Sequence, residues 1–295
     1  KNKNFNKLEP FTGLFTQGMV CHETYKDKDD KWLSPDEVNS DDGKNFYNKK
    51  NPKEKIIVGS SESMSKSKKN TIDPENIISN YGSDAVRMFI LSDSPPEKDI
   101  QWSDQGMLAS YKFIQKFWLL HQKIKDKLKN KKNKSGNSVS LNEFTNLLIE
   151  ELTKNLEKFN YNVVIANFHK TYNFLNQQLD KDINNEQFLE NYIKILKIMF
   201  PVIPHITSEC LEELKYKKKL EWPKINQKYL FKKNIDIVIQ INGKKRAVIN
   251  IKKNITENEL INELHKNVTI SKYLKDKKIN KSIFIQNKLI NLIIK

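Results

Sequence analysis

The stretch SDQGMLASYKFIQKFWLLHQKIKDKLK, residues 103–129, decides the fold of the middle of this 295-residue chain. Its large side chains recur every three or four residues, which is the spacing of one face of an α-helix. These positions are Met107, Tyr111, Ile114, Trp118, His121, Ile124 and Leu128. We therefore predict one long helix from about Ser103 to Lys129, followed by a Lys- and Asn-rich linker at 129–138.

The helical pattern continues after this linker. Ser140 and Glu143 have the spacing of a capping box, which marks the start of a helix. Three stripes of apolar side chains follow, at 144–156, 164–179 and 188–199. Stripes of this kind form the core between packed helices, so we predict an α-helical bundle over residues 101–222.

Residues 233–295 change to the alternation that is typical of β-strands. The segment IDIVIQINGKKRAVINI (235–251) alternates on both sides of Asn242-Gly243, a dipeptide favoured in type I′ hairpin turns. A capping box at Thr256 predicts a helix to about Lys266, and KSIFIQ and LINLIIK indicate two more strands. We predict a small ββαββ domain of the α+β class.

Residues 1–100 are less regular. We expect FTGLFTQGMV (11–20) to form a buried turn and strand, and the Lys-, Asp- and Asn-rich residues 26–55 to form a surface insertion. KIIVG (55–59) is a short predicted strand, which leads into the polar loop SSESMSKSKKN (60–70).

Two short helices should follow this loop. Asp73-Pro74 is a helix start with Asp as the N-cap, and Gly82 suits a left-handed C-terminal cap. Ser83-Asp84 is then expected to cap the second helix. The chain as a whole is predicted to be mainly α, with α/β and α+β parts.

Composition indicates the class of partner. Lys and Arg number 52 against 36 Asp and Glu, which gives a net charge of +16 and favours an anionic partner such as nucleic acid. Overuse of Lys on solvated surfaces is the alternative reading. The two cysteines, Cys21 and Cys210, are too few for a disulfide framework, so we expect a reducing, cytoplasmic setting. No apolar run is long enough to cross a membrane. The sequence begins with Lys1 rather than Met, which we interpret as part of a longer protein.

The loop MSKSKKN (64–70) carries the most informative chemistry. Lysines on a loop can approach a triphosphate and neutralise the charge that develops in a transition state. Serine hydroxyls can donate hydrogen bonds to phosphate oxygens. A solvated surface turn is the alternative for a loop of this composition.

This loop is similar to the Lys-Met-Ser-Lys-Ser signature of class I aminoacyl-tRNA synthetases, here at 63–67. The segment from DPENIISNYG to KFIQKFW (73–118) resembles leucyl-tRNA synthetases without interruption. FTQGMVCHETY upstream, FPVIPHITSECLEEL with Trp222-Pro223 downstream, and the two C-terminal segments VIQINGKKRAVINI and KSIFIQNKLINLIIK also resemble that family. The resemblance implies the end of a Rossmann-type catalytic domain (1–100), a helical tRNA-binding domain (101–222) and a small C-terminal tRNA-binding domain (233–295).

The resemblance also implies a reaction. Leucine and ATP, with Mg²⁺, would form leucyl-adenylate, and leucine would then pass to leucine tRNA. Lys66 matches the second Lys of the signature and would be the catalytic residue that stabilises the α-phosphate and the departing pyrophosphate. Met64, Ser65, Lys66 and Ser67 would form the ATP-binding loop. Ser63 stands where the signature has its first Lys, which removes one charge.

The other signature of the family, His-Ile-Gly-His, is absent from the sequence. The N-terminal catalytic half and the editing domain that the resemblance implies are missing with it. Because catalysis requires both halves to be positioned together, we expect the isolated chain to be inactive and to need the missing half as a partner.

Clustered basic residues are the candidates for tRNA contact because Lys and Arg neutralise phosphates. They are Lys112, Lys116, Lys123, Lys244, Lys245, Arg246, Lys275, Lys277 and Lys278. No metal site is predicted: Cys21-His22 has no second ligand pair at a suitable spacing. His121 and His169 lie in helical patterns and are interpreted as packing or surface residues.

Two alternatives remain open at this point. A stand-alone tRNA-binding subunit or chaperone would carry the loop as a relic, in keeping with Ser63. A synthetase for valine, isoleucine or methionine would share the signature, but the C-terminal domain argues against it.

Overall fold

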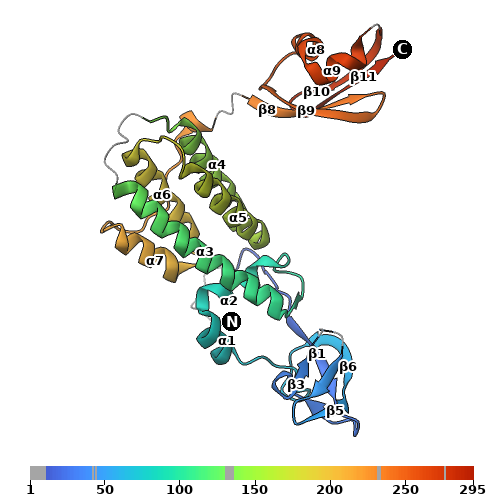
Figure 1. Cartoon of the computed structure of the whole chain (residues 1–295), viewed down its shortest axis with the longest axis vertical. Helices are drawn as coiled ribbons and strands as arrows, with labels where there is room; N and C mark the ends of the chain where they lie inside the picture. Colours follow the sequence, from blue (N-terminus) through green and yellow to red (C-terminus); the bar gives the residue numbers. More distant parts are fainter. Residues whose placement is uncertain (1–10, 42, 44, 130–135, 231–233, 276) are drawn as a thin grey trace, which may run out of the picture. The chain divides into compact units, whose positions relative to one another are not determined.

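A computed structural model describes residues 11–295 except 42, 44, 130–135, 231–233 and 276. The chain forms two compact units, residues 1–225 and 226–295 (Figure 1). The predicted mixture of a dominant α part with α/β and α+β parts is confirmed. The predicted three-domain division, with its boundaries near residues 100 and 222, stays a prediction. Part of the predicted linker, 130–135, lies outside the described residues.

The first unit begins with a mixed sheet. Strand β1 (Val20–Lys26) pairs antiparallel with β6 (Ile57–Ser63) and with β2 (Trp32–Leu33), and its first residues pair in parallel with β7 (Ile100–Gln101). The prediction of a buried turn and strand at 11–20 is wrong for residues 11–19. Residues 11–19 form no strand and are mostly exposed, since β1 starts only at Val20.

A small antiparallel sheet is inserted between β2 and β6. It consists of β3 (Val38–Ser40), β4 (Phe46–Asn48) and β5 (Asn51–Lys55), and a turn of 3₁₀ helix, η1 (Pro35–Glu37), precedes it. The predicted insertion is therefore folded rather than a simple surface loop. A few apolar side chains hold it against β1: Tyr25, Leu33 and Val38, with Phe46 and Ile56 packed against them.

Two short helices follow the polar loop, as predicted. Helix α1 (Pro74–Tyr81) is capped by the Asp73 carboxylate, which accepts a hydrogen bond from the Glu75 amide. Gly82 has φ +79°, a conformation that glycine adopts without the steric cost a Cβ would bring, and α2 (Ser83–Ser92) begins directly after it. The predicted capping of α2 by Ser83-Asp84 is wrong, because no side chain caps this helix.

The bundle contains the predicted long helix α3 together with α4, α5, α6 and α7, and most of its core side chains are apolar. Their bounds are Asp104–Lys129, Val139–Glu157, Tyr161–Gln178, Asn185–Met199 and Pro204–Glu213. The buried face of α3 is wider than the predicted stripe, because α2, α5 and α7 all contact this helix. Phe113, Phe117 and Leu120 are buried on α3, whereas Trp118 is only half-buried.

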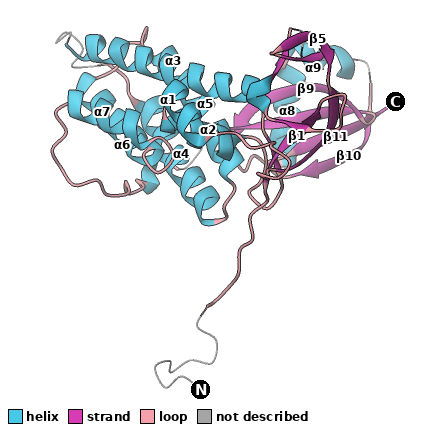
Figure 2. Cartoon of the chain, turned by 90° about the horizontal axis from the view of Figure 1, so that it is seen from below, coloured by secondary structure: helices cyan, strands magenta, loops and turns pink. Residues whose placement is uncertain are grey.

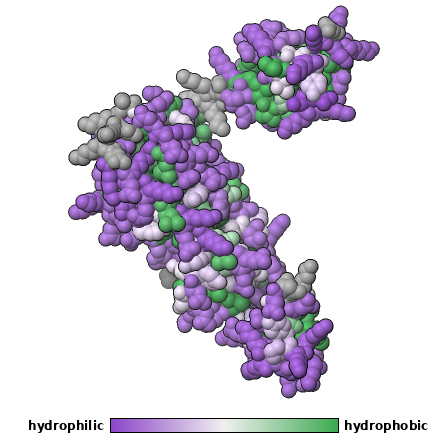
Figure 3. Space-filling model, in the orientation of Figure 1, coloured by the Kyte–Doolittle hydropathy of each residue, from purple (hydrophilic) through white to green (hydrophobic). Residues whose placement is uncertain are grey.

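The predicted capping box at Ser140 is wrong. Helix α4 starts at Val139 with Ser138 as its N-cap residue, and no side chain caps it. The backbone amide of Val139 instead donates a 2.9 Å hydrogen bond to the side-chain oxygen of Asn137. In the described part of the chain, no helix is long and apolar enough to cross a membrane. The visible surface is mainly hydrophilic (Figure 3).

The second unit is a four-stranded sheet with two helices on one face. In the sheet order β10-β11-β8-β9, only the central pair β11 and β8 is parallel. The hairpin turn is confirmed, since Asn242 and Gly243 both have positive φ, at +49° and +77°. The elements are β8 (Asn234–Ile241), β9 (Lys244–Lys252), α8 (Glu257–Lys266), α9 (Val268–Leu274), β10 (Ile279–Ile285) and β11 (Leu289–Ile294).

Helix α9 was not predicted from the sequence. The Asn267 side chain caps it by accepting hydrogen bonds from the amides of Thr269 and Ile270. Ile270 and Leu274 of α9 join Leu260 and Leu264 of α8 over the sheet, and all four are buried. The helices and strands of both units are distinguished by colour in Figure 2.

Candidate functional site

The loop 64–70 leaves the end of strand β6. Ser63 is the last residue of that strand and is exposed, and the backbone amide of Met64 donates a 3.2 Å hydrogen bond to the Val20 carbonyl oxygen of β1. The first residue of the loop is therefore still tied to the sheet, and the loop starts from a fixed point.

Asn70 fixes the other end of the loop. It is fully buried, and its side-chain oxygen accepts a 2.8 Å hydrogen bond from the Ser65 amide. Its side-chain nitrogen lies 3.2 Å from the carbonyl oxygens of His22 and Glu62, on the two neighbouring strands. A buried amide with all these partners stabilises one conformation of the loop. Asn70 belongs to the motif 64–70, but no role was predicted for it from the sequence.

The three lysines of the loop differ in their partners. Lys68 forms an ion pair with Glu62 of β6, and the Lys69 ammonium lies 3.9 Å from a carboxylate oxygen of Glu37 in η1. Lys66 is exposed, and within the described residues it has no ion-pair partner. Of the charges in the loop, the one on Lys66 is thus the least engaged by the protein.

The acidic partners of Lys68 and Lys69, which are Glu62 and Glu37, both have lowered pKa values. The hydrogen bond from Lys68 lowers the pKa of Glu62 below its ordinary value, with a further contribution from Ser60. The pKa of Glu37 is lowered mainly by hydrogen bonding from the Ser34 backbone, and also by Lys69. Both carboxylates are therefore ionised at neutral pH, when their lysine partners are charged.

Serine hydroxyls line the turn of the loop. The Oγ atoms of Ser65 and Ser67 are 2.8 Å apart, and Ser67 is exposed. Lys69 closes the turn with φ +53°, and its amide donates a hydrogen bond to the Lys66 carbonyl oxygen. The exposed ammonium of Lys66 and the exposed hydroxyl of the adjacent Ser67 can both donate hydrogen bonds to an anion such as phosphate.

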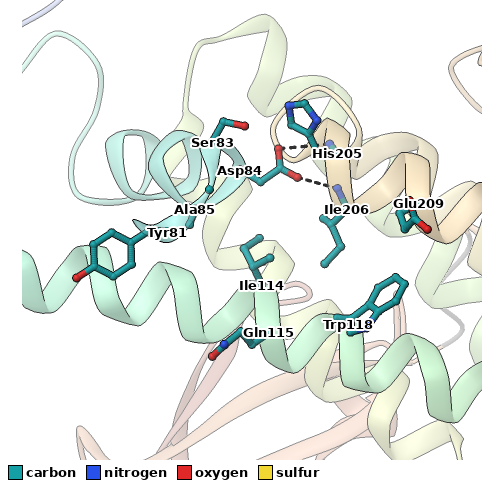
Figure 4. Close-up of a pocket in the computed structure, with 11 residues that line it drawn as sticks. Tyr81, Ser83, Asp84, Ala85, Ile114, Gln115, Trp118, His205, Ile206 and Glu209 are labelled. Atoms are coloured by element: carbon teal, nitrogen blue, oxygen red, sulfur yellow. Dashed lines mark hydrogen bonds between the residues drawn. The ribbon is translucent and has the colours of Figure 1, made fainter. Parts of the chain in front are cut away.

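Asp84 connects the helices after this loop to the bundle. Its carboxylate is buried and accepts hydrogen bonds from the first-turn amides of α7, from Ile206 at 2.8 Å and from His205 at 3.3 Å (Figure 4). Helix α7 has no side-chain cap of its own, so Asp84 supplies this cap from α2. Arg87, one turn further along α2, pairs with the same carboxylate at 3.1 Å.

A pocket of about 540 Å³ lies beside this contact. Its walls are mostly apolar, with polar groups at Ser83, Gln115, His205 and Glu209. The remaining lining residues are Tyr81, Gly82, Asp84, Ala85, Ile114, Trp118 and Ile206. Neither the pocket nor the contact of Asp84 with α7 was predicted from the sequence, because the residues involved come from α2, α3 and α7.

The predicted tRNA-contacting residues lie in the two separate units. Lys112, Lys116 and Lys123 are exposed on α3. In the second unit Lys244, Lys245 and Arg246 are exposed at the start of β9, and Lys275, Lys277 and Lys278 are exposed after α9. Arg246 lies over the ring of Tyr273 of α9, at 4.7 Å from its centroid, so the β9 group contacts that helix.

His121 is a packed residue of the bundle and His169 a surface residue, in keeping with their interpretation from the sequence. His121 is fully buried, with Nδ1 3.0 Å from the Tyr192 hydroxyl and Nε2 2.9 Å from a carboxylate oxygen of Glu213. His169 lies against the Phe113 ring at 4.6 Å. Desolvation lowers the pKa of both histidines. Within the described residues, no group of His, Cys, Asp and Glu is arranged to hold a metal ion.

Known proteins match this chain along its length. Residues 53–103 match the family model of class I tRNA synthetases (I, L, M and V), and residues 139–261 match that of the anticodon-binding domain of tRNA ligase. The leucine–tRNA ligase of Orientia tsutsugamushi is 38% identical over 293 residues, which cover 97% of this chain and 34% of the relative. The leucine–tRNA ligase of Rickettsia massiliae is 36% identical over 303 residues, which cover 100% of this chain and 35% of the relative.

A solved structure shares the fold. The LeuRS of Agrobacterium radiobacter K84, in a ternary complex with tRNA and LeuAMS, aligns with a TM-score of 0.66 over 79% of this chain and 32% of that chain, at 23% sequence identity. The chain spans about a third of the length of the relatives it matches. The chain belongs to the leucine–tRNA ligase family, of whose members it corresponds to a C-terminal portion.

Proposed function

We propose that this chain is the part of a leucine–tRNA ligase that supplies the ATP-side signature loop and binds leucine tRNA. The observation that carries the proposal is the likeness to leucine–tRNA ligases over 97% to 100% of the chain. The complete enzyme would form leucyl-adenylate and pyrophosphate from leucine and ATP with Mg²⁺. It would then transfer leucine to the terminal ribose of the tRNA, in the cytoplasm.

Lys66 is the residue that we assign to catalysis. Its ammonium is exposed and has no ion-pair partner among the described residues, so it can approach the triphosphate without breaking an ion pair. There it would stabilise the negative charge that develops on the α-phosphate and on the departing pyrophosphate. Lys68 and Lys69 would have to leave Glu62 and Glu37 to do the same.

The neighbouring residues would hold the loop and bind ATP. Met64 fixes its start through the backbone bond to β1, and the contact between Ser65 and Ser67 shapes its turn. The exposed Ser67 hydroxyl can donate to a phosphate oxygen. Ser63, in place of the first Lys of the signature, adds no charge, so Lys66 would supply the catalytic cation of this loop on its own.

The activity would require the N-terminal half of the enzyme, with its His-Ile-Gly-His signature. Because reacting groups must be held together for adenylate formation, this chain alone should not catalyse ATP–pyrophosphate exchange. Measurable exchange by the isolated chain would contradict this part of the proposal.

The proposed binding of leucine tRNA is tested by a titration. The chain is titrated by filter binding against leucine tRNA, which has a long variable arm, and against a tRNA with a short one, over a series of salt concentrations. A preference for leucine tRNA that persists at about 150 mM salt is the expected result, because generic attraction to phosphates falls steeply with salt. Equal binding of both tRNAs that disappears with salt would overturn the tRNA part of the proposal.

A further inference from the structure

We propose that the segment Lys215–Lys219, directly after helix α7, is a binding site for the phosphate backbone of tRNA. This inference rests on the proposed function, to which it adds a contact surface on the bundle. The basic contacts predicted for the bundle from the sequence lie on α3 and do not include this segment.

The segment concentrates charge that the protein does not neutralise. Lys215, Lys217, Lys218 and Lys219 are all exposed, and none of them forms an ion pair within the described residues. Some other bundle lysines are paired, such as Lys154 with Glu150 at 2.8 Å. Four adjacent ammonium groups repel one another, so an anionic ligand that neutralises them is favoured.

The backbone of the segment is fixed by its own contacts. The Tyr216 amide donates a 2.9 Å hydrogen bond to the Leu211 carbonyl oxygen, and the Lys215 amide donates one of 2.8 Å to Glu212. The Tyr216 hydroxyl donates to the Lys219 carbonyl oxygen at 3.4 Å. A fixed backbone keeps the lysine Cα positions close together before any ligand binds, which lowers the entropic cost of binding.

Lys215 occupies an unusual position for its residue type. It follows the C-cap of α7 with φ +57°, where glycine is preferred because a Cβ is strained in this conformation. A cation at the C-terminal end of a helix interacts favourably with the helix dipole, which accounts for Lys215. It does not explain Lys217, Lys218 and Lys219, which follow beyond the last turn.

A recess lies next to these lysines and has the character of a phosphate site. Its volume is about 510 Å³, and its charged lining residues are Lys215, Lys217, Lys218 and one carboxylate, Glu212. Ser208 adds an exposed hydroxyl. The excess of cations over carboxylates favours an anion, and ammonium and hydroxyl groups are donors for phosphate oxygens.

The aromatic ring at this site is not available for stacking on a base. Tyr216 is half-buried, and the ammonium of Lys197 lies over its ring at 5.0 Å from the centroid. Recognition of single-stranded RNA relies on stacking of bases on exposed aromatic rings. We therefore assign the site to the sugar-phosphate backbone of a folded RNA, which lysines bind without reading the sequence.

The test compares two triple variants of the full chain with the same change in net charge. One is K217Q/K218Q/K219Q in the proposed site. The other is K26Q/K129Q/K154Q, which removes exposed or half-exposed lysines that are paired with Asp30, Asp126 and Glu150. Binding to leucine tRNA is measured over a salt series, and circular dichroism confirms that both variants are folded.

Each phosphate contact contributes about −0.9 to the slope of log K against log salt concentration for a duplex. The site variant should therefore lose about two to three from the magnitude of this slope, and the paired-lysine variant less than one. Equal losses in the two variants, or no loss in the site variant, would overturn the site while leaving tRNA binding intact. Absence of tRNA binding by the parent chain would overturn the proposed function and the site with it.

Discussion

The carboxylate of Asp84 accepts a 2.8 Å hydrogen bond from the amide of Ile206, 122 residues further along the chain. Asp84 belongs to α2, which follows the signature loop and α1, and Ile206 lies in the first turn of α7. The amides at the start of a helix have no partner within it, so an external carboxylate that accepts from two of them is a helix cap. This cap ties the segment after the loop to the bundle.

Replacement of Asp84 by Ala should destabilise the first unit by roughly 2–4 kcal/mol, because buried amides of α7 lose a charged acceptor. Urea unfolding followed by tryptophan fluorescence measures this, since all four tryptophans lie within residues 1–225. Asp93→Ala is the matched control: Asp93 is exposed at the other end of α2, and its loss should change stability little. Equal effects of the two substitutions would argue against the cap.

Asn70→Ala should loosen the loop 64–70. It leaves the Ser65 amide and the carbonyl oxygens of His22 and Glu62 without their buried partner, at a cost of roughly 2–3 kcal/mol. Asn70→Asp should cost more, because it also buries a charge. Hydrogen exchange at the Ser65 amide reports the change. Asn80→Ala, at an exposed position of α1, should leave this exchange rate unaltered.

Lys66 should matter more to leucine activation than its neighbours. In a chimera that joins this chain to the N-terminal portion of the Orientia relative, Lys66→Ala should lower ATP–pyrophosphate exchange about 10²- to 10³-fold, the usual effect of removing one transition-state donor. Lys68→Ala and Lys69→Ala should each lower it less than about 10-fold, since their ammonium groups are paired with Glu62 and Glu37. Similar losses for all three would contradict the assignment.

Acid should destabilise the first unit in two stages. Desolvation lowers the pKa of His121 and His169 below 6.5 in the folded chain, so the unfolded chain binds protons more readily. The contribution of these two histidines to the stability of the first unit is therefore complete above pH 6.5. It falls as the pH drops from 6.5 toward the lowered pKa values. The pKa of Glu213 is lowered to about 2, mainly by the hydrogen bond from Lys125, so its contribution is present above pH 4.5 and is lost as pH falls through about 2.

Unfolding experiments at a series of pH values separate these groups. The variant His121→Gln should remove part of the upper stage, and H121Q/H169Q should remove most of it. His205→Gln, at an exposed position of α7, should leave the profile as it is. An unchanged upper stage in the double variant would contradict the assignment to these two histidines.

Gly243→Ala should destabilise the second unit by about 1–2 kcal/mol, because Gly243 has φ +77° and a Cβ is strained there. The added methyl group meets no atom within 4 Å, so strain in the backbone is the whole cause. Gly243→Asn should cost less, since Asn tolerates this conformation better than Ala. Hydrogen exchange of the β8 and β9 amides measures the difference.

Local sequence rules succeeded wherever the structure depends on neighbouring residues. The spacing in 103–129 predicts α3 within one residue of its observed start, and Asn242-Gly243 predicts the hairpin turn because both positions need positive φ. Asp73 caps α1 as expected for a local N-cap.

Local sequence rules failed where the contacts of a residue depend on a partner far away in the sequence. Asp84 has the position of a local cap for α2, yet its carboxylate binds α7, which follows far along the chain. The difference between Lys66 and its neighbours depends on Glu62 and Glu37, which β6 and η1 bring to the loop. No pattern within the motif itself distinguishes these three lysines.

The position of β11 (Leu289–Ile294) in the middle of its sheet has a consequence for synthesis. It pairs with β10 on one side and with β8 on the other, so β10 cannot join the β8–β9 hairpin in one sheet until β11 has left the ribosome. The first unit, whose contacts lie within residues 1–225, can fold earlier during translation. A ribosome that stalls within the last strand would therefore present a folded bundle followed by an unclosed sheet, with the apolar side chains of β8 still in water.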